Sequence, residues 1–201
     1  MRTRVLGSAL AMLILIASAK ADSIFTLGQH LGPAQNVLVG IQVGTRIEGV
    51  TNQTGMTVVF RSTTNVITGT SGHAAIVAAN RAPLNNVTIT VPGFFFSSIL
   101  IDPVERQRGD IMVMVRLAGG KIQNFTYPGT TGNNFLTITT INSELISSVT
   151  INSKAGFESL SHTRFRSAPG SFVVVPEANT LGLFGTGMVG LFGMMRRKLQ
   201  T

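Results

Sequence analysis

The sequence predicts a mainly β protein, an antiparallel β-sandwich of jelly-roll type, flanked by an N-terminal signal helix and a C-terminal transmembrane helix. Three observations predict this architecture. Between residues 22 and 172, short runs rich in Val, Ile, Thr and Phe alternate with Gly, Pro and Asn clusters that mark turns. No stretch in that part keeps the period of an amphipathic helix. Each end of the chain combines an apolar run with basic residues.

The strands are expected where the apolar pattern is clearest. Val87, Ile89 and Val91 alternate with threonines, so they are expected to face a core. The runs 94–101 and 111–115 are almost continuously apolar, which is typical of strands covered on both faces, or nearly so. Further strands are expected at 37–43, 56–60, 122–125, 135–141, 148–151, 163–166 and 171–174.

The connections indicate antiparallel pairing. Residues 118–121, Ala-Gly-Gly-Lys, form a tight turn that joins 111–115 and 122–125 as a hairpin. No helical crossover of the length that a parallel pair needs lies between the strands.

Charge and cysteine content exclude several function classes. Of the 16 basic residues, six lie in the two ends, and Glu177 is also terminal. The ten basic and seven acidic residues that remain give the central part a net charge of only +3, too little for a nucleic-acid-binding surface. The absence of cysteine excludes disulfides, thiolate nucleophiles and Cys-ligated metals.

Residues 1–21 are interpreted as a secretory signal peptide. A basic start precedes an apolar run, and Ala19 and Ala21 are the small residues that signal peptidase requires, so cleavage is expected before Asp22. The alternative is an uncleaved anchor helix, but the apolar run is short for a membrane span.

The chemistry-bearing residues predict no enzyme and no cofactor. The carboxylates Asp102, Glu105 and Asp110 are weak candidates for a calcium site or for an acid–base pair. Arg106 and Arg108 lie among them and oppose a cation, so a solvated, internally ion-paired loop is favoured. No metal site is predicted otherwise, because the histidines have no ligand spacing and are interpreted as surface or turn residues: His30, His73 and His162.

The final segment, 173–201, has three parts in a fixed order. The motif Pro176-Glu177-Ala178 comes first, followed by an uncharged run at 181–195 that contains five glycines. As a helix this run would span about 22 Å, so it crosses a hydrocarbon core of about 30 Å only if its flanks contribute. The basic cluster Arg196-Arg197-Lys198 is expected to stay in the cytoplasm.

This order resembles the PEP-CTERM sorting signal of Gram-negative bacteria. Pro176 and Glu177 match the first two positions of its Pro-Glu-Pro motif, and Ala178 replaces the usual second proline. The resemblance implies processing near the motif by an exosortase, after signal peptidase has acted and while the tail is held in the inner membrane. It also implies delivery to the cell surface or to an exopolysaccharide matrix.

A weaker resemblance covers residues 132–165, which are similar to the last strands of jelly-roll domains common in PEP-CTERM proteins. Ser161 and His162 stand where such domains often carry Asp-Asn residues. The sequence therefore does not predict a metal or polar site at these positions.

The leading hypothesis is an exported, non-enzymatic surface or biofilm-matrix protein. The alternative is a carbohydrate-binding module for exopolysaccharide, although one Tyr and no Trp leave few rings for stacking on sugars. A glycan hydrolase is the third hypothesis, and it requires two cleft carboxylates among five candidates: Asp102, Glu105, Asp110, Glu144 and Glu158.

Overall fold

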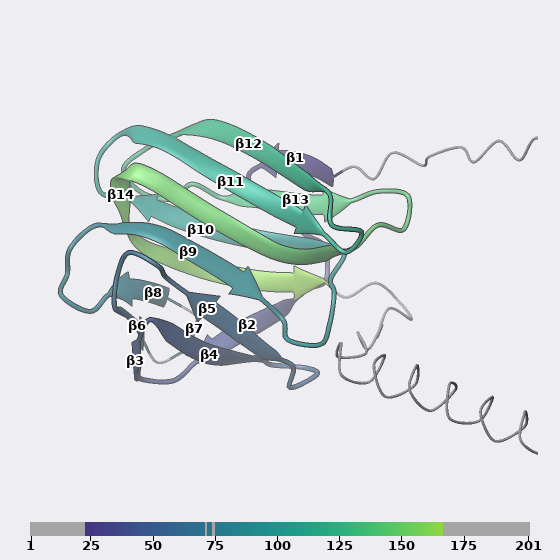
Figure 1. Ribbon diagram of the computed structural model, residues 1–201, viewed down its shortest axis with the longest axis horizontal. Helices are drawn as coiled ribbons and strands as arrows, with labels where there is room; N and C mark the ends of the chain where they lie inside the picture. The colour runs from purple at the N-terminus through teal and green to yellow at the C-terminus, as the bar shows by residue number, and fades with distance from the viewer. Residues whose placement is uncertain (1–22, 71, 74, 167–201) are drawn as a thin grey trace, which may run out of the picture.

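The computed structural model describes residues 23–70, 72–73 and 75–166 (Figure 1). The predicted signal peptide 1–21, the predicted strand 171–174 and the sorting tail with its transmembrane run 181–195 lie outside the described residues. Within the described ranges, no helix has the length and apolarity to cross a membrane.

The described residues form fourteen strands, and every pairing between named strands is antiparallel. The predicted mainly β, antiparallel class is therefore confirmed. The strands are β1 (Ser23–Leu27), β2 (Gln35–Val39), β3 (Gln42–Gly44), β4 (Arg46–Thr51), β5 (Thr57–Arg61), β6 (Ile67–Thr70), β7 (Gly72–His73), β8 (Ala75–Ala78), β9 (Leu84–Thr90), β10 (Ser98–Glu105), β11 (Gly109–Leu117), β12 (Ile122–Gly129), β13 (Leu136–Thr140) and β14 (Ile146–Arg166).

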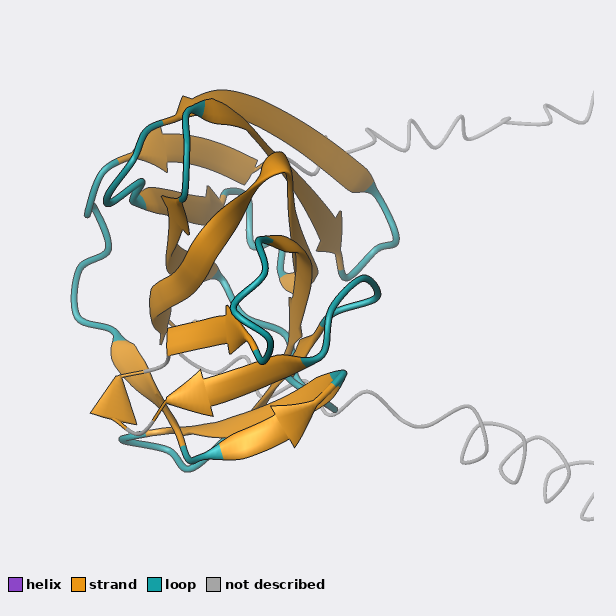
Figure 2. Ribbon diagram, turned by 90° about the vertical axis from the view of Figure 1, so that its left-hand side faces the viewer, coloured by secondary structure: helices purple, strands orange, loops and turns teal. Residues whose placement is uncertain are grey.

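The 21-residue strand β14 pairs with one set of strands along its first part and with another set along its second part. Its first part pairs with β11 on one side and β9 on the other. Its second part pairs with β10 and also contacts β8 and β2. One strand thus belongs to two layers, and Figure 2 shows the strands curving around a common interior.

The change of partner occurs at a bend that requires glycine. The register of β14 against β9 shifts between Asn152 and Phe157. Gly156 lies in this bend with φ +78°, in the left-handed region that favours glycine. A Cβ there would also lie 2.2 Å from Cβ of Pro83. Backbone conformation and close packing therefore both restrict this position.

The core fills the space between the layers. Val87, Ile89 and Val91 all belong to it, as their alternation predicts. Every residue of the buried core cluster lies between Val37 and Phe165. A fragment covering 22–172 therefore contains the whole core of the described residues and is expected to fold alone.

Five strand predictions were wrong in detail. The run 94–101 corresponds to β10, which begins only at Ser98 and continues to Glu105. The run 37–43 is interrupted at Gly40 and Ile41 and gives two strands, β2 and β3. The apolar run of β11 is covered on one face only, because Met112 is 38% exposed on the other. The predicted strands 148–151 and 163–166 are parts of the single strand β14. The strands that the pattern missed are β1, β4, β6, β7 and β8.

Candidate functional site: a buried polar cluster and a polar sheet face

The carboxylates predicted to lie in one solvated loop are separated. Asp102 and Glu105 belong to β10 and are 0% and 2% exposed, whereas Asp110 lies exposed on β11. The turn is confined to residues 106–108. The ion-paired loop prediction was wrong because β10 continues through the acidic residues into the interior. Among the described residues, no three His, Cys, Asp or Glu side chains come together as a metal site.

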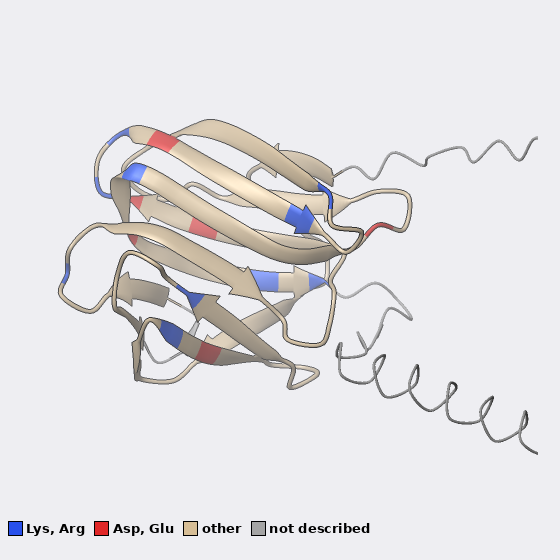
Figure 3. Cartoon of the chain, viewed as in Figure 1, with Lys and Arg blue, Asp and Glu red and all other residues tan. Residues whose placement is uncertain are grey.

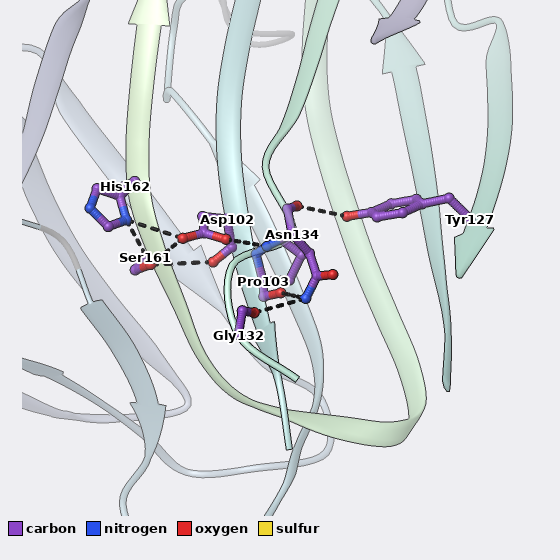
Figure 4. Close-up of polar contacts among 7 residues, drawn as sticks. All are labelled: Asp102, Pro103, Tyr127, Gly132, Asn134, Ser161 and His162. Carbon is purple, nitrogen blue, oxygen red and sulfur yellow. Dashed lines mark hydrogen bonds and ion pairs between the residues drawn. The ribbon is translucent and has the colours of Figure 1, made fainter. Parts of the chain in front are cut away.

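Asp102 is the centre of a polar cluster that joins three segments of the chain (Figure 4). Its Oδ1 accepts the backbone N–H of Asn134 at 2.7 Å. Its Oδ2 lies 3.2 Å from both the Ser161 hydroxyl and Nδ1 of His162. The buried carboxylate thus uses both of its oxygens. One holds the connection between β12 and β13 against β10, and the other holds β14 against it.

A β-bulge brings Ser161 and His162 to Asp102. The register of β10 against β14 shifts between Leu100 and Asp102, and His162 adopts φ +51°, which is uncommon for a residue with a side chain. Its imidazole packs edge-on against Phe135, with ring centroids 5.4 Å apart. The bulge turns two consecutive side chains toward the carboxylate.

The cluster does not have the geometry of a serine hydrolase. In such enzymes the carboxylate and the hydroxyl contact opposite nitrogens of the imidazole. Here the Ser161 hydroxyl lies 3.0 Å from Nδ1 of His162, the same nitrogen that contacts Asp102. The imidazole therefore cannot accept a proton from the hydroxyl on one nitrogen while the carboxylate orients it through the other. The arrangement favours a structural role.

Asn134 is held by both its backbone and its side chain. Its Nδ2 lies within 2.7–2.9 Å of the carbonyls of Pro103, Thr130 and Gly132, and its Oδ1 accepts the Thr130 N–H at 2.8 Å. Its own carbonyl accepts the Tyr127 hydroxyl at 3.2 Å. The amide thereby closes the loop from residue 130 to residue 134 upon itself.

Tyr127 remains a hydrogen-bond donor in this environment. Burial and the nearby carboxylates of Asp102 and Glu105 raise the pKa of its hydroxyl. Beside it lies an open depression of about 270 Å³. Its lining residues are Leu27, Gly28, Tyr127, Pro128, Asn133, Asn134 and Phe135.

Glu105 differs from Asp102 because neither of its carboxylate oxygens has a hydrogen-bond partner among the described residues. Burial raises the pKa of Glu105. The Ser153 hydroxyl lowers it in part but does not complete a hydrogen bond to either oxygen, and it accepts the Gly156 N–H instead. Burial therefore disfavours the charged form of Glu105 relative to a carboxyl in water.

The outer face of the sheet formed by β11, β14, β9, β5 and β4 is polar. Paired residues from neighbouring strands form rows across it, and the Thr88 and Thr150 hydroxyls are 2.9 Å apart in one of them. Figure 3 shows basic segments of β4 and β5 close to each other on this sheet. One row consists of Met114, Thr150, Thr88, Arg61 and Arg46, and the next of Arg116, Ser148, Thr90, Val59 and Glu48.

The sequence predicted part of this arrangement. Asp102 was a candidate, but the sequence did not indicate its contacts with Ser161 and His162. Asn134 was missed because its role depends on a residue 32 positions away. His30 fits its predicted role as an ordinary residue: it is exposed and its Nε2 lies 3.0 Å from the Leu27 carbonyl.

Comparison with known proteins identifies the end of the chain. The model of the PEP-CTERM protein-sorting motif matches residues 174–198. No curated protein matches the chain.

Two solved structures show a weak overall similarity. A family 29 carbohydrate-binding module from Piromyces equi is 7% identical with a TM-score of 0.31, and 71% of this chain and 89% of that one are covered. The family 11 carbohydrate-binding module of the cellulosomal cellulase Lic26A-Cel5E of Clostridium thermocellum is 8% identical with a TM-score of 0.24, and 73% and 88% are covered. Similarity at this level carries no information about a ligand.

The described residues thus form an antiparallel β protein, and the matched motif marks a chain that is exported. It is a PEP-CTERM sorting domain-containing protein, as the resemblance of its tail indicated. The motif implies transient anchoring in the membrane, processing by an exosortase and sorting outward.

Proposed function

We propose that this protein is a non-enzymatic component of the cell surface or extracellular matrix of a Gram-negative bacterium, delivered there by its sorting tail. The observation that carries the proposal is the shared use of Nδ1 of His162 by Asp102 and Ser161. The cluster most similar to a catalytic centre is arranged to hold the fold together.

The burial of the acidic residues supports the same proposal. A glycan hydrolase needs two carboxylates that reach substrate in one cleft. Asp102 and Glu105 are 0% and 2% exposed, so neither reaches solvent. Glu158 lines a depression whose other lining residues include no second carboxylate.

Export and sorting are tested on the full chain in a bacterium that contains an exosortase. Mass spectrometry of surface material should find a mature N-terminus at Asp22 and no peptide from the Arg196-Arg197-Lys198 end. Replacing Pro176 and Glu177 by alanine should leave the protein in the inner-membrane fraction, whereas Pro169→Ala, outside the motif, should not. An intact C-terminus in surface material would contradict the proposal.

A second candidate function is binding to exopolysaccharide, and the polar rows on the outer sheet face favour it. Five adjacent strands present hydroxyl, amide and guanidinium groups on one surface, and such groups recognise the hydroxyls and acidic groups of sugars. Retention of the 22–172 fragment on immobilised matrix polysaccharide would support this candidate. Passage through every such column would exclude it.

A further inference from the structure

Two arginines face each other on the outer surface of the sheet. Arg46 on β4 and Arg61 on β5 are direct cross-strand partners, and both are exposed. Like charges opposite each other on adjacent strands are destabilising unless an anion compensates them. Their positions therefore need a reason beyond the stability of the sheet.

Among the described residues, one carboxylate forms an ion pair with these arginines. Nη2 of Arg46 lies 2.6 Å from Oε1 of Glu48, in an ion pair that is about half exposed. Within the described part of the chain, the Arg61 guanidinium makes no ion pair and no hydrogen bond. One full positive charge is left available at the surface.

A depression of about 250 Å³ lies beside the two arginines. Thr88 and Thr90 of β9 line it with Pro92 and Val59. The Thr90 hydroxyl has no hydrogen-bond partner among the described residues, so it is available to a ligand. Guanidinium and hydroxyl donors around one hollow are the groups that bind a carboxylate or a sulfate.

The hollow continues along the sheet. A second depression, of about 510 Å³, shares Arg46 and Pro92 with the first and extends to Thr57 and Phe94; Glu48, the ion-pair partner of Arg46, also lines it. Two connected depressions fit an extended chain better than a single small anion.

The side chains of the surface also select the class of polymer. No aromatic side chain of the described residues is among the exposed large ones, and the half-buried Phe94 at the second depression is the one aromatic ring beside this surface, so neutral sugar rings or nucleobases find little to stack on. The central part of the chain carries a net charge of only +3, which does not favour a nucleic acid. The donors that are present recognise acidic groups.

We infer that Arg46, Arg61, Thr88 and Thr90 form a subsite for the acidic groups of an anionic polysaccharide. This inference rests on the second candidate function, exopolysaccharide binding, and specifies its ligand class and its location. Arg61 is the main contact because its charge is uncompensated. Arg46 contributes after exchanging its contact with Glu48 for the ligand.

Affinity electrophoresis of the 22–172 fragment in gels containing polygalacturonate, dextran sulfate or neutral dextran tests the inference. The first two gels distinguish carboxylate from sulfate as the acidic group. The Arg61→Gln variant should bind the preferred acidic polymer about tenfold more weakly, as expected for the loss of a hydrogen bond to a charged group. Arg108→Gln removes the same charge from the exposed turn after β10 and is the matched control.

The outcomes separate the inference from the function on which it rests. Retardation by an acidic polymer that Arg61→Gln weakens about tenfold and Arg108→Gln preserves supports both. Equal retardation of the two variants, or retardation by neutral dextran alone, overturns the subsite but leaves polysaccharide binding in place. Absence of retardation in all gels overturns both, and tighter binding to single-stranded DNA than to either acidic polymer overturns the assigned ligand class. Thermal unfolding of each variant verifies that it is folded.

Discussion

The backbone N–H of Asn134 donates to Oδ1 of Asp102 at 2.7 Å, and the two residues are 8% and 0% exposed. This bond fixes the connection between β12 and β13 to β10 in a region that water does not reach. Because a hydrogen bond to a buried carboxylate is stronger than one between neutral groups, its loss is costly to the fold.

Replacing Asp102 by alanine is expected to destabilise the domain by about 2–3 kcal/mol, because the Asn134 N–H is left buried without an acceptor. Asp102→Asn should cost less, since its amide oxygen can still accept that N–H. Asp110→Ala, at an exposed carboxylate on β11, is the control and should change stability by about 0.5 kcal/mol or less. Urea unfolding of the 22–172 fragment measures all three. Equal stability of the Asp102→Ala and Asp110→Ala variants would show that the cluster is not structural.

Gly156→Ala is expected to cost at least about 2 kcal/mol, because the methyl group meets Cβ of Pro83 and the backbone has positive φ. Gly32→Ala is the matched control, since no atom lies within 4 Å of the added methyl group and its φ is not positive. Thermal unfolding of both variants compares them. A Gly156→Ala variant as stable as the control would mean that the bend in β14 adjusts easily.

The same bend shows where sequence patterns stop being informative. Alternation at Val87, Ile89 and Val91 predicted a core-facing strand because one face of that strand packs in the core and the other is polar. Residues 152–156, Asn-Ser-Lys-Ala-Gly, have the composition of a turn between strands. They lie within one strand because its two halves pair with different partners, β9 and β10, and this depends on contacts distant in the sequence.

The sequence contained even less information about the polar cluster around Asp102 than about the bend in β14. Asp102 lies among charged residues and resembles part of a solvated loop, yet its strand continues into the interior. The partners that compensate its charge are Asn134 and the bulged residues Ser161 and His162, and no local pattern links these positions. The sorting motif was predicted correctly because its signal is contiguous and needs no folded context.

Replacing Ala178 by proline restores the usual third position of the sorting motif. We expect the tail of this variant to be processed at least as fast as that of the natural chain, because an exosortase is the enzyme that the motif implies. A pulse–chase experiment in the exosortase-containing host, with the loss of the terminal basic cluster as the readout, measures the rate. Ser167→Pro, which also introduces a proline but lies upstream of the motif, is the control. Slower processing of Ala178→Pro would show that this exosortase prefers alanine.

Glu105 predicts how stability changes with pH. Burial raises the pKa of this carboxyl in the folded state above its ordinary value of 4.5, so the folded state holds the proton more tightly than the unfolded state. The contribution of Glu105 to stability is therefore fully present below pH 4.5 and declines as pH rises toward the folded-state pKa. Glu105→Gln removes this dependence, so the variant should gain stability over the natural chain as pH increases from 4 to 8.

The free energy of unfolding of the 22–172 fragment, measured across this range, tests the sign of the effect. The exposed Glu158→Gln is the control for the loss of one charge. If the stability of the natural chain instead rises relative to that of Glu105→Gln with increasing pH, the prediction is wrong. A bound cation or donor would then be holding Glu105 ionised in the folded state.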